Sequence, residues 1–221
     1  MAIDVVLFDL DQTLLDKQQT LTVFSEYQHK CFALHRYADL QTFKNFFMSL
    51  NNQPLPKTVV YEEIGRQCDI PDKLLEELLQ NLNEYFPEFS KGFPGLHYML
   101  AALHKQKYKI GIVTNGRDFY QRHKITALAI EQYMDLIVTS DQLSIRKPEP
   151  QIFQYALDYF RVQAANTVFI GDHLEADIFP AKELGMLTIH KTTDASSNAH
   201  ASTNCLKNIP RIIDKLTKYE A

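Results

Sequence analysis

Short apolar runs rich in β-branched residues recur along the chain, and each ends abruptly at a polar or acidic residue. They occupy residues 5–8, 110–113, 136–138 and 168–170. Buried parallel strands are continuously apolar in this way because helices cover both faces of their sheet. Helical patterns lie between or after these runs, at 96–105, 118–128, 150–159 and 177–184. The alternation predicts an α/β fold built on a doubly wound parallel sheet.

The strand pattern is interrupted after the first strand, between residues 17 and 91. Apolar residues in this segment recur at helical spacing, which predicts an all-helical insertion of about four or five helices. We therefore expect a core domain of residues 1–16 and 92–221 and an inserted helical domain of residues 17–91. The residues that carry the helical pattern include Leu21, Phe24, Tyr27, Cys31 and Leu34, then Leu74, Leu75, Leu78, Leu79, Leu82 and Phe86.

The C-terminal part of the chain shows two further patterns. Residues 192–204 are rich in Ser, Thr, Asn and Ala and have no periodicity, which is typical of a surface loop. Residues 209–216 have helical spacing again. We expect them to close the chain as a helix.

Charge and composition narrow the classes of partner. The formal net charge is −4, and residues 17–91 carry 8 Lys+Arg against 10 Asp+Glu, so no basic surface for nucleic acid is indicated. No apolar stretch approaches the roughly 20 residues that span a bilayer. Asp4 and Asp9 interrupt the apolar N-terminal segment, which argues against a signal peptide. The three cysteines lack disulfide or zinc spacing. We expect a cytoplasmic protein, monomeric or weakly dimeric, that binds neither nucleic acid nor membrane.

Polar residues that could carry chemistry follow the predicted strands. In open α/β sheets, ligands bind outside the carboxyl ends of the strands, so these residues are expected to converge. Each segment alone is also a common turn or helix cap. Their order along the chain, carboxylate, hydroxyl, lysine and carboxylate, is the informative feature. The segments are Asp9-Leu10-Asp11-Gln12-Thr13, Thr114-Asn115-Gly116, Arg146-Lys147-Pro148, and Gly171-Asp172 with Asp177 further on.

These segments resemble the motifs of a known superfamily. VLFDLDQTLLD, VTNG, RKPEPQIF and GDHLEAD are similar to the four motifs of the haloacid dehalogenase superfamily of aspartate-nucleophile phosphotransferases. Residues 110–190 also resemble the branch that contains house-cleaning nucleotidases and acylneuraminate phosphatases, and the helical insertion resembles the mobile cap of that family. The resemblance implies a Rossmann-like core and a phosphatase that hydrolyses a small phosphomonoester.

The resemblance also implies a role for each motif residue. Asp9 is the nucleophile that forms an aspartyl-phosphate, so that one difficult displacement becomes two easier ones. Asp11 protonates the leaving oxygen and then deprotonates the attacking water. Thr114 and the backbone of Asn115 hold phosphoryl oxygens, and Lys147 neutralises charge on both the phosphate and the nucleophile.

A hard cation fits an acidic site that binds a phosphate. Mg²⁺ prefers oxygen ligands and keeps several waters beside a phosphate, so few protein ligands are needed. The ligands that the resemblance implies are Asp9, the backbone carbonyl of Asp11, and Asp172. Asp177 matches the second acid of the last motif, which supports the water shell of the metal or the neighbouring loop.

Two positions depart from the pattern of the superfamily. Gln12 stands where Gly, Asp or Asn is usual, and His173 stands where a small hydroxyl residue is commoner. Neither change removes a catalytic group. For His173, a hydrogen bond near the metal and a partly exposed loop position remain alternatives.

Four other functions are possible alternatives to the phosphatase. A phosphoacceptor signalling receiver needs neither the long helical insertion nor the late Gly171-Asp172 motif with Asp177, and both features argue against it. A haloacid dehalogenase needs neither a metal nor a second acid, so Asp11 and Asp172 argue against it. A non-enzymatic interaction protein on the same fold remains an alternative because a fold does not establish an activity, and so does a phosphomutase. A nucleoside monophosphate or a sugar phosphate is the expected substrate.

Overall fold

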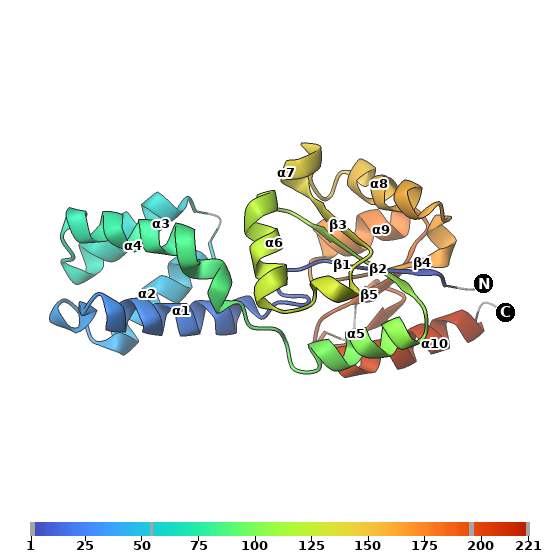
Figure 1. Cartoon of the computed structure of the whole chain (residues 1–221), viewed down its shortest axis with the longest axis horizontal. Helices are drawn as coiled ribbons and strands as arrows, with labels where there is room; N and C mark the ends of the chain where they lie inside the picture. The colour runs from blue at the N-terminus through green and yellow to red at the C-terminus, as the bar shows by residue number, and fades with distance from the viewer. Residues whose placement is uncertain (1–2, 54, 195–196, 220–221) are drawn as a thin grey trace. The chain divides into compact units, whose positions relative to one another are not determined.

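The computed structural model describes residues 3–53, 55–194 and 197–219. The chain divides into two compact units, a larger one of residues 1–16 and 92–221 and a smaller one of residues 17–91 (Figure 1). None of the helices in the described ranges is both long and apolar enough to cross a bilayer.

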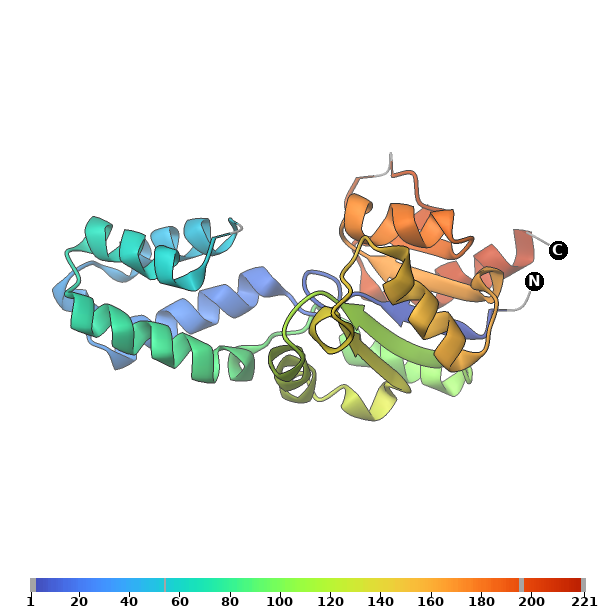
Figure 2. The ribbon, with the colours of Figure 1, turned by 90° about the horizontal axis from the view of Figure 1, so that it is seen from above.

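The smaller unit is a helical bundle (Figure 2). Its core is aromatic, because Phe24, Phe43 and Phe47 are fully buried and their rings lie against one another. Tyr61 is buried beside them and donates a hydrogen bond from its hydroxyl to Gln28 Oε1 at 2.6 Å, so its polar end is satisfied inside the bundle. The α-helices of this unit are α1 (Lys17–Cys31), α2 (Leu40–Asn51), α3 (Lys57–Cys68) and α4 (Asp72–Tyr85).

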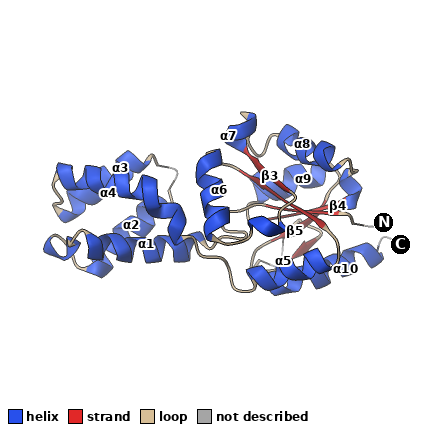
Figure 3. Ribbon diagram, in the orientation of Figure 1, coloured by secondary structure: helices blue, strands red, loops and turns tan. Residues whose placement is uncertain are grey.

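The larger unit contains a parallel sheet of six strands, drawn red in Figure 3. The spatial order is β3-β2-β1-β4-β5-β6, so the first strand of the chain lies in the middle of the sheet between β2 and β4. This crossover order places the carboxyl ends of β1, β2 and β4 next to one another. The strands are β1 (Val5–Phe8), β2 (Lys109–Thr114), β3 (Leu136–Thr139), β4 (Thr167–Gly171), β5 (Leu187–His190) and β6 (Ala201–Ser202).

Helices cover both faces of this sheet, as Figure 1 shows. In β1, Val6 and Phe8 belong to the core that α5, α6 and α10 complete, whereas Val5 and Leu7 point to the core under α8 and α9. Both sets are buried, which explains the uninterrupted apolar run and confirms the predicted doubly wound fold. The helices of this unit are α5 (Leu96–Lys105), α6 (Asp118–Ala127), α7 (Ser140–Leu143), α8 (Pro150–Phe160), α9 (Phe179–Glu183) and α10 (Ile209–Tyr219).

Two local predictions need correction. The segment 192–204 is not entirely loop, because β6 within it pairs with β5 in parallel; two residues are too few to show periodicity, and positions 195 and 196 lie outside the described residues. The helix expected at 177–184 begins as a π-helical turn, Leu174–Ile178, and continues as α9. Gly185 stops it with a φ of +91°, a conformation that glycine adopts without strain.

Candidate active site

The carboxyl edge of the sheet gathers most of the residues that the motifs single out. Asp9 directly follows β1, Thr114 ends β2, and Asp172 directly follows β4, so three neighbouring strands each deliver one polar group. Asp9 is only 6% exposed and Thr114 is 1% exposed. A buried carboxylate at a strand end needs partners, because burial penalises the charged form.

Lys147 supplies the main partner. Its Nζ lies 2.6 Å from Asp9 Oδ1 and 2.6 Å from Asp177 Oδ1, and its side chain is nearly fully buried. Asn115 fixes the backbone at this point: its Nδ2 donates to the Lys147 carbonyl at 3.0 Å, and its Oδ1 accepts from the Lys147 amide at 2.9 Å. The motif that follows β2 therefore orients the lysine that bridges the two acids.

Three acids lie around Lys147. Asp9, Asp172 and Asp177 each offer a carboxylate oxygen, and these oxygens lie within 4.8 Å of one another. Burial raises the pKa of Asp9 to about 7, with Asp177 and Asp172 contributing and Lys147 opposing. Burial, followed by the charge of Asp177, also raises the pKa of Asp172. The cluster holds more negative charge than Lys147 balances, and its all-oxygen donors fit a hard divalent cation.

The carboxylate of Asp11 points to helix α6. Lys124 Nζ donates to its two oxygens at 2.8 and 3.0 Å, and Gln121 Nε2 donates to Oδ2 at 3.0 Å. Asp11 and Asp9 come from the same loop, yet their side chains have different partners. This arrangement separates the two acids that the sequence assigns to different chemical roles.

Gln121 and Lys124 are contact residues outside the segments that the sequence singles out, and Thr13 lies in the first of those segments without an assigned role. Gln121 Nε2 also reaches Thr114 Oγ1 at 2.8 Å, and Thr13 Oγ1 donates to Asp172 Oδ1 at 3.3 Å. The available signal was on the predicted helix 118–128, where Gln121 and Lys124 lie three residues apart. Residues at that spacing share one face of a helix, and here it is a buried face.

The two departures from the superfamily pattern have local explanations. Gln12 has a φ of +63°, the left-handed conformation that glycine adopts most easily, which accounts for the usual preference at this position. His173 is exposed, and its Nδ1 accepts a hydrogen bond from the Ala176 amide at 3.2 Å. Its own amide donates to Asp177 Oδ2 at 3.1 Å. The backbone amide of His173 thereby helps to fix the position of the Asp177 carboxylate.

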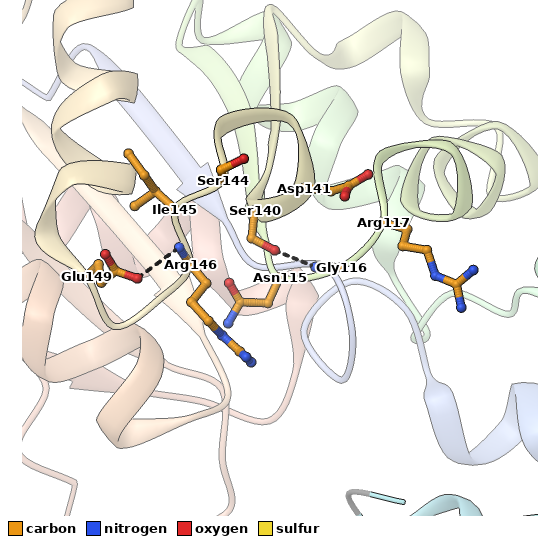
Figure 4. A pocket seen from close by; sticks show the side chains of 9 residues that line it. All are labelled: Asn115, Gly116, Arg117, Ser140, Asp141, Ser144, Ile145, Arg146 and Glu149. Carbon is orange, nitrogen blue, oxygen red and sulfur yellow. Dashed lines mark hydrogen bonds between the residues drawn. The ribbon is translucent and has the colours of Figure 1, made fainter. Parts of the chain in front are cut away.

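A pocket of about 540 Å³ opens beside Asn115, between the loop after β2 and the segment after β3 (Figure 4). Ser140 Oγ accepts a hydrogen bond from the Gly116 amide at 3.0 Å and joins the two segments. Arg117 and Arg146 line the pocket from opposite sides, together with acidic side chains. The volume is of the size that takes small molecules.

Comparisons with known proteins agree on one family. Residues 6–191 match the family of haloacid dehalogenase-like hydrolases. The glyceraldehyde 3-phosphate phosphatase of Pyrococcus furiosus is 29% identical over 196 residues, which cover 85% of this chain and 80% of that protein. The pyrimidine 5'-nucleotidase YjjG of Escherichia coli is 27% identical over 202 residues, 84% of each chain.

A solved structure shares the fold over nearly the whole chain. The crystal structure of the HAD phosphatase from Thermococcus onnurineus superposes with a TM-score of 0.64 at 26% identity. The match covers 96% of this chain and 98% of that one. Both units therefore have counterparts in a protein named as a phosphatase.

Proposed function

This chain belongs to the haloacid dehalogenase-like hydrolase family, and we propose that it is a Mg²⁺-dependent phosphomonoesterase that works through an aspartyl-phosphate on Asp9. The observation that carries the proposal is the buried Lys147, which contacts Asp9 and Asp177 at 2.6 Å beside Asp172. Such a site concentrates acids and one cation where a phosphate dianion would have to bind. Attack by a carboxylate on a phosphomonoester needs this balance of charge.

In the first step, a carboxylate oxygen of Asp9 attacks the phosphorus and the bond to the ester oxygen breaks. Asp11 gives its proton to that leaving oxygen, so the alcohol departs neutral. The hydroxyl of Thr114 and the backbone of Asn115 hold phosphoryl oxygens, and Lys147 offsets the negative charge that accumulates between nucleophile and substrate.

In the second step, a water molecule attacks the phosphorus of the aspartyl-phosphate. Asp11 takes a proton from this water, the bond between phosphorus and the Asp9 oxygen breaks, and inorganic phosphate leaves. The cycle returns both acids to their starting states. Every proton that Asp11 gives in the first step is therefore recovered in the second.

Asp9, Asp172 and the backbone carbonyl of Asp11 are the residues we propose to hold Mg²⁺, with Asp177 supporting the water shell. The clustered carboxylate oxygens support this assignment. The bound ion would neutralise phosphoryl oxygens during transfer.

The proposed substrate is a small phosphorylated metabolite, either a nucleoside monophosphate or a sugar phosphate. The named activities of the relatives, on glyceraldehyde 3-phosphate and on pyrimidine nucleotides, support this class. We propose that the unit of residues 17–91 is a cap that contacts the leaving group and excludes water. A turnover screen of phosphorylated metabolites tests this, and a much faster reaction with a phosphopeptide would contradict it.

Metal removal tests the metal site. EDTA is expected to abolish hydrolysis of 4-nitrophenyl phosphate and Mg²⁺ to restore it, whereas Ca²⁺ restores little because its longer, looser coordination misplaces the phosphoryl group. Asp172→Asn is expected to raise the Mg²⁺ concentration needed for half-maximal rate, and Asp158→Asn, on the exposed side of α8, leaves it unchanged. Full activity in EDTA would exclude metal dependence.

Asp11→Asn tests the acid and base role. Turnover of an alkyl phosphate is expected to fall by roughly 10²–10⁴-fold, because the leaving alkoxide then departs without a proton. An aryl phosphate should still phosphorylate Asp9, since a phenolate leaves unaided. Mass spectrometry of the quenched enzyme measures the adduct, and near-normal turnover of the alkyl phosphate would overturn the role.

A further inference from the structure

The position of the Asp11 carboxylate is fixed by one face of α6. Lys124 contacts both of its oxygens, at 2.8 and 3.0 Å, and Gln121 contacts one of them at 3.0 Å. Both donors are buried: Lys124 is 7% exposed and Gln121 is 2% exposed. Surrounding packing restricts these donors, so they leave the carboxylate little rotational freedom.

A buried lysine is costly unless a carboxylate accompanies it. Lys124 lies on the inner face of α6 next to the core residue Ile125, and its Nζ is 5.5 Å from the centre of the Tyr120 ring. Apolar residues would fill this face of the helix at lower cost. The ion pair with Asp11, and not packing, therefore explains why a lysine occupies this position.

Gln121 connects Asp11 to the residues proposed to bind phosphate. Besides Asp11, its amide nitrogen lies 2.8 Å from Thr114 Oγ1 and 3.3 Å from the Asn115 carbonyl oxygen. One side chain thus joins the loop after β1 to the end of β2. The acid and the phosphoryl-binding hydroxyl keep a fixed spacing as a result.

We infer that Lys124 and Gln121 are positioning residues that orient Asp11 for the hydrolysis of the aspartyl-phosphate. This inference rests on the proposed function. In that step Asp11 must present an oxygen to the attacking water, which loses a proton to it as the bond between phosphorus and Asp9 breaks. Phosphorylation of Asp9 by an activated aryl phosphate makes no such demand, because the phenolate leaves without a proton.

The two steps can be measured separately with 4-nitrophenyl phosphate and Mg²⁺. In a two-step mechanism, kcat/KM reports phosphorylation, and kcat reports hydrolysis when hydrolysis is slow. Lys124→Met is expected to lower kcat and KM together by roughly ten- to a hundredfold and to leave kcat/KM within about twofold. Rapid mixing should show a burst of one nitrophenolate per active site, and mass spectrometry should find phosphoryl groups accumulated on the Asp9 peptide.

A structural role would give a different result. If Lys124 merely anchored α6, its loss would disturb Thr114 and Asp9 as well, and kcat/KM would fall with kcat. That outcome, or an unchanged kcat, overturns the inference. Lys124→Arg, which keeps a cation, should recover most of kcat. Should Lys124→Met fail to fold, Lys124→Gln replaces the ammonium by a shorter, uncharged amide and is expected to show the same burst.

Lys109→Met is the matched control. Lys109 Nζ pairs with Asp135 Oδ1 at 2.9 Å at the opposite end of β2, with a side chain that is 61% exposed. Loss of this surface pair should change neither kcat nor the burst. If neither the wild type nor Asp11→Asn forms an adduct on Asp9, the proposed function itself is contradicted, whereas an adduct in Asp11→Asn without a burst in Lys124→Met contradicts only the positioning role.

Discussion

Replacing Asp9 with asparagine should stop turnover, with kcat lowered by roughly 10⁴- to 10⁶-fold, the range expected when a nucleophile is removed. An amide is a poor nucleophile, and it is also a weaker ligand for Mg²⁺ than a carboxylate. The phosphoryl adduct on the peptide that contains Asp9 should be absent even with an activated aryl phosphate. An adduct on another residue, or near-normal turnover, would refute the mechanism.

The stability of the same variant supplies the control. Burial raises the pKa of Asp9 to about 7 from an ordinary value of 3.8, so at pH 7 and above the folded state carries an ionised acid that its surroundings disfavour. Asparagine has no charge, and Lys147 keeps Asp177 as a partner. Without metal, Asp9→Asn should therefore unfold at a temperature no lower than the wild type at pH 8. Lost activity with an intact fold isolates the chemical role.

The sequence predicts four of the six strands because each of these four carries an apolar run that ends at a polar residue. Val5–Phe8 is apolar at every position, since both faces of β1 pack on helices. Asp4 and Asp9 mark the two ends of this run. The edge strand Ala201–Ser202 has no such run, because backbone pairing with β5 alone defines it. The apolar runs therefore reveal β1, β2, β4 and the edge strand β3, whereas the inner strand β5 and the edge strand β6 are missed.

The candidate site divides in a similar way. Asp9, Thr114 and Asp172 are visible in sequence because each stands at the end of an apolar run, a position that the sheet itself brings together. The contacts of Asp11 with Lys124 cross 113 positions of sequence and depend on how α6 is rotated against the sheet. No local pattern encodes that rotation. The polar residues Gln121 and Lys124 at helical spacing are the one feature of the sequence that points to it.

Lys147→Met should produce the second large effect, on stability as well as on activity. It leaves the buried acids Asp9 and Asp177 without the ammonium that now lies 2.6 Å from each. Breaking a buried ion pair from one side costs about 3–5 kcal/mol of unfolding free energy. Activity toward 4-nitrophenyl phosphate should fall by roughly 10³-fold or more, since the loss of one preorganised charge contact already costs 10²–10³.

The dependence of this loss on pH follows from the sign of the pKa change. Lys147 lowers the pKa of Asp9, so its removal raises that pKa further above the ordinary value of 3.8. An acid whose pKa is raised by folding destabilises the folded state above that pKa and ceases to do so below its ordinary value. The difference in unfolding free energy between wild type and Lys147→Met should thus be largest near pH 8 and shrink toward pH 4. Denaturant titrations at both pH values measure it, with Lys109→Met as the exposed-lysine control, and a difference that is independent of pH would show that Lys147 is not the counter-charge of this cluster.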